Sequence, residues 1–99
     1  MTYLWEYIME LCTEYEINAK GIEISIENNK VNVADKFTLS IGDRVFLFGY
    51  AGTYIETKLL AIEESNDDWT IKFDYDIVET VPKTNNKLHT FWVLIGKIN

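Results

Sequence analysis

Residues 21–34 read G-I-E-I-S-I-E-N-N-K-V-N-V-A, the stretch with the clearest structural pattern in the chain. Isoleucines at every second position before the two asparagines, and valines at the same spacing after them, are typical of two strands that bury one face. Asparagine tolerates the positive φ of a type I′ turn, so the pair Asn28-Asn29 predicts a two-residue connection. With that turn, Glu27 lies opposite Lys30 and the isoleucines lie opposite the valines. The stretch therefore predicts a β-hairpin over residues 22–34.

The segments on either side of this hairpin predict one helix and several further strands. Over residues 1–18, apolar side chains recur at the three- and four-residue spacing of one helix face, which predicts an amphipathic helix. Residues 37–98 contain alternating or short apolar segments separated by turn residues, which predicts antiparallel strands. Within that region, residues 69–78 predict one strand. Residues 53–63 have a composition that also fits a helix, but Tyr54-Ile55 and their place between strands favour one long strand.

A helix followed by strands with short connections is typical of the α+β class. The length of 99 residues predicts a single domain over residues 1–99. Two packings fit these elements. In one, the helix packs on a curved antiparallel sheet of five to six strands. In the other, it caps one end of a small SH3-like barrel.

The charge of the chain is strongly acidic, with 16 Asp and Glu against 9 Lys and Arg and a formal net charge of −7. Such a surface repels phosphate, which argues against direct binding of nucleic acid or of an anionic membrane. It favours a basic protein surface as the partner. A single cysteine, Cys12, excludes an internal disulfide and fits the reducing cytoplasm. No apolar stretch approaches the roughly 20 residues of a membrane span, and no secretory signal is visible.

The residue types that carry catalysis are sparse. His89 is the single histidine, so a zinc site with two histidines cannot form, and no serine lies in a nucleophile motif. Asp74 and Asp76 fall two apart on the predicted strand and could offer oxygen ligands to Ca²⁺ or Mg²⁺. Lys72 lies on the same predicted face as a competing counter-ion, and the spacing does not match a calcium-binding loop. The sequence therefore predicts neither an enzyme nor a metal or cofactor site.

Carboxylates recur on three segments that are predicted to face solvent: Glu6, Glu10 and Glu14 on the helix, Asp67 and Asp68 in a turn, and Asp74 and Asp76 on a strand. Spaced carboxylates can imitate a phosphate track and fill a cationic groove. Twelve Ile, eight Asn and eight Lys against one Arg suggest an AT-rich genome, and small acidic proteins of this make-up often come from phages or mobile elements. We therefore interpret the chain as a non-catalytic acidic binding protein, a phage or mobile-element inhibitor of a nucleic-acid-handling protein. Tyr3 and Tyr7 would act as exposed aromatic anchors.

Two other interpretations stay open. The segments G-D-R-V-F at 42–46 and W-T-I-K-F-D-Y at 69–75 resemble strands of SH3-like and Tudor-like barrels over part of the chain. The resemblance implies a module that binds a peptide or small ligand against aromatic faces. Its pocket would be formed by Tyr50, Tyr54, Trp69 and Tyr75. A third interpretation is a structural subunit that forms homo-oligomers through an edge strand or a helix face.

Overall fold

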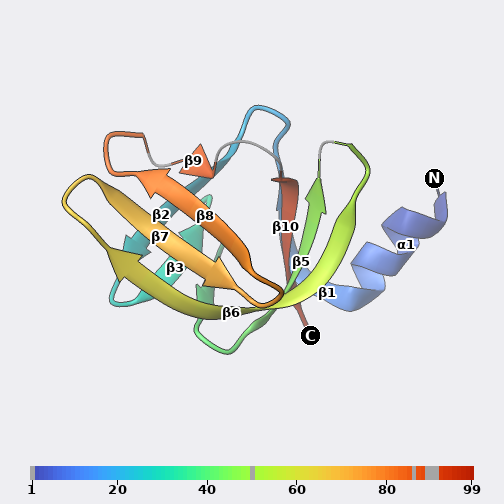
Figure 1. Cartoon of the computed structure of the whole chain (residues 1–99). Helices are drawn as coiled ribbons and strands as arrows, with labels where there is room; N and C mark the ends of the chain where they lie inside the picture. Colours follow the sequence, from blue (N-terminus) through green and yellow to red (C-terminus); the bar gives the residue numbers. More distant parts are fainter. Residues whose placement is uncertain (1, 50, 86, 89–91) are drawn as a thin grey trace.

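One helix and ten strand segments make up the described part of the chain (Figure 1). The computed structural model describes the backbone of residues 2–49, 51–85, 87–88 and 92–99, and the side chains of these residues except 2–4 and 87–88. The elements are α1 (Thr2–Leu11), β1 (Cys12–Ile17), β2 (Ile22–Glu27), β3 (Lys30–Val33), β4 (Phe37–Ser40), β5 (Arg44–Gly49), β6 (Tyr54–Glu64), β7 (Asp68–Phe73), β8 (Ile77–Pro82), β9 (Lys87–Leu88) and β10 (Trp92–Ile98).

The strands form two sheets. Six strands follow the order β1-β10-β5-β6-β7-β8, and four follow the order β4-β3-β2-β9. The predicted combination of one N-terminal helix with antiparallel strands is confirmed. The predicted count of five to six strands is too low, and the strands do not close into a barrel within the described residues. Part of the difference arises because the predicted helix over residues 1–18 contains a strand and the predicted strand over residues 69–78 contains two.

The hairpin over residues 22–34 is confirmed in its turn and in its register. Asn28 and Asn29 have φ values of 54° and 60°, as a type I′ turn requires. Glu27 pairs with Lys30 across the two strands, and Ile24 and Ile26 of β2 face Val33 and Val31 of β3. The predicted strand at residues 53–63 is also confirmed, since β6 covers Tyr54–Glu64.

The predicted helix over residues 1–18 is wrong in its second half. α1 ends at Leu11, and residues 12–17 form β1, which pairs with β10 in an antiparallel ladder. The segment T-E-Y-E-I alternates in polarity as well as fitting a helix, and pairing with β10 satisfies its backbone on one side. Tertiary pairing therefore overrides the helical spacing at this point.

The predicted strand at residues 69–78 is also wrong, because it is a hairpin. β7 ends at Phe73, β8 begins at Ile77, and the three residues between them form the turn. Tyr75 and Asp76 have φ values of 65° and 58°. The amide of Asp74 donates to the carbonyl of Lys58 at 2.9 Å, which ties the turn to β6. Asp74 and Asp76 therefore lie in a turn and not on one face of a strand.

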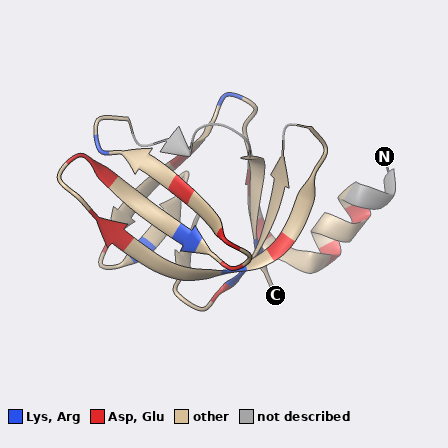
Figure 2. Cartoon of the chain, viewed as in Figure 1, with Lys and Arg blue, Asp and Glu red and all other residues tan. Residues whose placement is uncertain are grey.

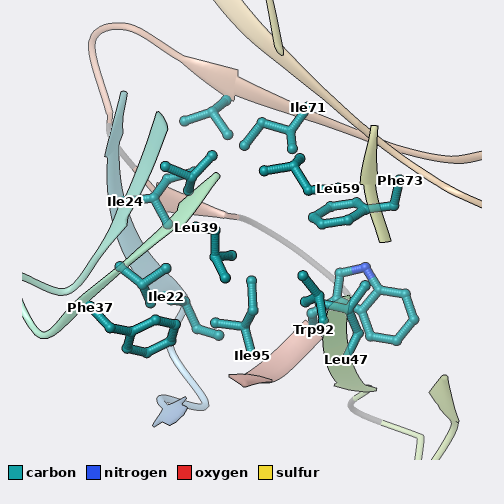
Figure 3. Close-up of a cluster of buried hydrophobic side chains, with 14 residues drawn as sticks. Ile22, Ile24, Phe37, Leu39, Leu47, Leu59, Ile71, Phe73, Trp92 and Ile95 are labelled. Atoms are coloured by element: carbon teal, nitrogen blue, oxygen red, sulfur yellow. The ribbon is translucent and has the colours of Figure 1, made fainter. Parts of the chain in front are cut away.

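The core has two parts on opposite faces of the six-stranded sheet. Side chains from both sheets point toward one another in the larger part (Figure 3), among them Ile22, Leu39, Leu47, Leu59 and Ile71. The smaller part lies beneath α1 and contains Ile8, Cys12, Phe46, Leu94 and Ile98. α1 thus covers the outer face of β1, β10 and β5 and reaches Glu56 on β6 through Tyr7, and it does not lie over β7 and β8 (Figure 1).

Candidate binding surface

Three tyrosines lie near Glu56, one on α1, one on β6 and one in the β7–β8 turn. The Tyr7 hydroxyl on α1 donates a hydrogen bond to Glu56 Oε2. Tyr54 lies two residues before Glu56 on β6 and therefore on the same face of the strand. Tyr75 lies in the turn and lines the same depression as Glu56, which has a volume of about 390 Å³. Tyr7, Tyr54, Glu56 and Tyr75 are called the tyrosine surface below.

A buried ring holds two of these tyrosines in place. Phe46 on β5 is fully buried, and its ring contacts Tyr7 edge-on with centroids 6.2 Å apart. Tyr54 stacks on the same ring at 5.9 Å. The exposed fractions are 41% for Tyr7, 56% for Tyr54 and 67% for Tyr75. Exposed aromatic rings on a fixed support are typical of the residues that dominate protein–protein binding energy.

The polar groups of the tyrosine surface satisfy one another. Arg44 Nη2 lies 3.4 Å from Glu56 Oε1, so this carboxylate accepts from a guanidinium and from a phenol. The hydrogen bond to Glu56 raises the pKa of Tyr7 above its usual value, which keeps the phenol protonated as the donor. The depression beside these groups is lined by side chains of both charges: the basic Arg44 and Lys58 and the acidic Glu56 and Asp74.

Four of the seven predicted acids lie within three residues of Tyr7 or Tyr75 along the chain. Glu6 and Glu10 are exposed on α1, on either side of Tyr7 in the sequence. Asp74 and Asp76 are exposed in the β7–β8 turn on either side of Tyr75. Figure 2 shows acidic residues on α1, on β6 and at both ends of β7. Glu6, Glu10, Asp74 and Asp76 are called the flanking acids below.

The other three predicted acids lie elsewhere. Asp67 and Asp68 are at the start of β7, six residues from the turn, which corresponds to about 20 Å along an extended strand. Glu14 is on β1 opposite Lys97 and on the face turned away from α1. The seven carboxylates therefore do not form one continuous patch.

None of the seven acids has an ion-pair partner among the described side chains. The five ion pairs found there use other carboxylates, those of Glu16, Asp43, Glu56, Glu63 and Glu64. The charge of the flanking acids is thus available to a partner, although solvent and salt screen it.

Among the described rings of the predicted aromatic pocket, Trp69 lies apart from Tyr54 and Tyr75. Tyr50 lies outside the described residues. Trp69 is the second residue of β7 and Tyr75 lies in the turn after its end, so the length of the strand separates them. The Nζ atom of Lys83 lies 5.1 Å from the centroid of the Trp69 ring and also bonds Glu64 at 2.6 Å. The chain's own cation therefore occupies the face of Trp69.

Sequence reasoning missed the centre of this surface. Glu56 and Arg44 were not singled out, although the alternation of Y-I-E-T-K in residues 54–58 places Tyr54, Glu56 and Lys58 on one face. Tyr7 was expected only as an exposed anchor, and the side chain of Tyr3 lies outside those described. The contact between Tyr7 and Glu56 joins residues 49 positions apart, and no local pattern signals it.

Within the described residues, no group of three or more His, Cys, Asp or Glu side chains is arranged to hold a metal ion. His89 lies outside that part of the chain. Burial raises the pKa of the Cys12 thiol to about 11, so the thiol stays protonated at neutral pH and is a poor nucleophile. No helix in the described ranges is long and apolar enough to cross a bilayer. A scan against protein-family models matches none, and searches of curated proteins and of solved structures find none similar to this chain.

Proposed function

We propose that the chain is a non-catalytic binding protein that occupies a basic surface of another protein through the tyrosine surface and the flanking acids. One observation carries this proposal: exposed rings on a buried support lie beside exposed carboxylates that have no ion-pair partner among the described side chains. Tyrosine gives a large contact area at a low cost in side-chain entropy. Carboxylates at the rim accelerate association with a basic partner and select for it.

The charge balance of this region supports a basic partner and not an anionic one. The flanking acids and Glu56 give five carboxylates, against the two cations Arg44 and Lys58. Arg44 is already paired with Glu56. With a net charge of −7 over the whole chain, phosphate groups would be repelled.

The finer proposal is that the partner handles nucleic acid and that this chain inhibits it. Carboxylates that reach a phosphate-binding groove compete directly with DNA or RNA for the same lysines and arginines. Inhibition by competition requires no catalytic group on the inhibitor. The inferred origin in a phage or mobile element stays a prediction.

A capture experiment with matched variants tests the proposal. The tagged chain is incubated with extract of the cells that encode it, as wild type, as Asp74→Asn/Asp76→Asn and as Asp67→Asn/Asp68→Asn. Both double variants remove two charges, but only the first removes flanking acids. We expect the Asp74/Asp76 variant alone to lose at least tenfold in affinity, about 1.4 kcal/mol, for the purified partner. Wild-type affinity should also fall steeply between about 50 and 300 mM salt.

Equal affinity of the two double variants would contradict this proposal. A competition assay then addresses inhibition: the wild-type chain should displace a labelled oligonucleotide from the purified partner. A partner that binds the chain and its oligonucleotide together would exclude the competitive mechanism while leaving the binding role intact.

The depression beside Tyr75 favours a second candidate function, a module that binds a small ligand. Its volume of about 390 Å³ and its mixed lining of Arg44, Lys58, Asp74 and Tyr75 would suit a polar ligand with both charges. A thermal-shift screen of zwitterionic compounds against wild type and Tyr75→Ala tests this. Stabilisation of the wild type that Tyr75→Ala abolishes would support the ligand-binding candidate.

A further inference from the structure

β1 forms one end of the six-stranded sheet, and β10 is its one partner strand among the described residues. The amide of Asn18, directly after β1, donates to Val93 at 2.8 Å, so even-numbered residues of this segment turn their main-chain groups toward β10. Tyr15 and Ile17 therefore direct their N–H and C=O groups away from the sheet. No hydrogen bond from a described residue reaches these groups.

β4, the edge strand of the four-stranded sheet, differs from β1 because side chains bond its outward main-chain groups. On β4, the carbonyl of Thr38 accepts from Lys97 Nζ at 3.4 Å. The amide of Ser40 donates to Asp43 Oδ2 at 2.8 Å. Lys97 and Asp43 also lie 3.7 Å apart, so one ion pair blocks the edge of β4 against further pairing.

The open edge of β1 presents apolar side chains on one face and the exposed carboxylate of Glu14 on the other, where Lys36 and Lys97 are engaged by Glu16 and Asp43. Toward α1, Tyr15 lies 6.1 Å from the ring of Trp5, and Ile17 follows on the same face. Trp5 is 43% exposed and Ile17 48% exposed. On the opposite face Glu14 is exposed, whereas Glu16 is only 15% exposed and bonds Lys36 at 2.7 Å.

Pairing of β1 with a second copy of itself is opposed by charge. A two-fold antiparallel pairing centred on Tyr15 places Glu14 opposite Glu16 of the second copy. A pairing centred on Glu16 places this residue opposite itself. Like charges directly opposite one another destabilise a strand pair. These two registers are the ones within β1 that use both Tyr15 and Ile17, and neither places a basic side chain opposite the exposed Glu14, so a strand of different sequence suits this edge better.

We propose that the edge of β1 binds an extended segment of a partner protein, with a basic side chain opposite Glu14 and apolar side chains opposite Tyr15 and Ile17. The segment adds a strand to the six-stranded sheet through main-chain hydrogen bonds, and alternate side chains give the specificity. A partner sequence that alternates apolar and basic residues meets this requirement. The site is separate from the tyrosine surface, because β10 and β5 lie between β1 and β6.

Two synthetic peptides test the proposal on the full chain. One has the sequence T-V-K-V-K-V-T and the other T-V-E-V-E-V-T, both capped and labelled with a fluorophore. We expect fluorescence polarisation to show at least tenfold tighter binding of the basic peptide, and NMR hydrogen exchange to slow at the amides of Tyr15 and Ile17. No binding of the basic peptide up to about 1 mM, or unchanged exchange at both amides, would overturn the proposal.

Three variants separate edge pairing from general attraction. Ile17→Pro removes an outward N–H without breaking a bond to β10, so it should keep the circular dichroism spectrum and lose at least tenfold in peptide affinity. Glu14→Lys should reverse the preference between the two peptides. Asp67→Lys changes the net charge equally at a distant turn and should not reverse it. Equal effects of Glu14→Lys and Asp67→Lys would show that only net charge matters and would overturn the proposal.

Discussion

At the scale of single residues, Gly96 is required by close packing. A Cβ atom at this position would lie 2.6 Å from Cys12 Sγ and 3.3 Å from Cys12 Cβ. We predict that Gly96→Ala lowers the free energy of unfolding by about 1–3 kcal/mol through overpacking. The cost should be smaller in a Cys12→Ala background, because the nearest clashing atom is gone. Urea unfolding of the two single variants and the double variant measures the coupling, and equal costs in both backgrounds would contradict the clash.

Glu79 is a second residue whose role depends on its surroundings. Its carboxylate is half-buried and accepts a hydrogen bond from Trp92 Nε1 at 2.6 Å. Burial raises the pKa of this carboxyl, although the bond from Trp92 acts in the opposite direction. The folded protein therefore holds the proton more tightly than the unfolded chain. The resulting stability is fully present below the ordinary pKa of 4.5 and is lost as pH rises through the folded-state pKa.

We predict that Glu79→Gln raises the free energy of unfolding at pH 7, because glutamine can accept the Trp92 bond without burying a charge. The gain should shrink as the pH is lowered to 4, where the wild-type carboxyl is largely protonated in both states. Denaturant unfolding of the wild type and the variant at both pH values, followed by tryptophan fluorescence, measures the difference in the free energy of unfolding. A gain that is the same at pH 4 and pH 7 would show that burial of the charge is not its cause.

At the scale of elements, the residues in each turn determine whether the predicted strand boundaries are correct. The hairpin of β2 and β3 follows from two asparagines at positive φ together with matching apolar faces. β7 and β8 are joined by D-Y-D, in which Tyr75 also takes a positive φ. Tyrosine is uncommon in that conformation, so no local signal indicates the turn. The hydrogen bond from Asp74 to Lys58 on β6 helps to hold it there.

The β2–β3 turn allows a quantitative test. Asn29 has a φ of 60°, where glycine is unstrained and alanine is disfavoured. We predict that Asn29→Gly raises the free energy of unfolding by a few tenths of a kcal/mol, whereas Asn29→Ala lowers it by about 1 kcal/mol. Thermal and urea unfolding of both variants measures the effect. An alanine variant as stable as the glycine variant would contradict a type I′ turn at this site.

At the scale of the whole molecule, the two sheets and α1 place distant residues together. The tyrosine surface joins α1, β6 and the β7–β8 turn, and Tyr7 meets Glu56 only because α1 packs over Phe46. In the same arrangement, Asp67 and Asp68 lie at the end of β7 that is opposite to the β7–β8 turn. A sequence pattern can show that a carboxylate faces solvent, but it cannot show which other carboxylates share its surface.

The sequence by itself determined the features that depend on near neighbours: the acidic charge, the β2–β3 hairpin with its register, and the long strand β6. Each rests on side-chain alternation and turn residues within a few positions of one another. Only the tertiary structure decided where α1 ends, that residues 69–78 turn back on themselves, and which tyrosines and acids lie together. These features depend on contacts with β10, β6 and Phe46 that are distant in sequence, and such contacts override local preference when they satisfy the backbone and bury apolar area.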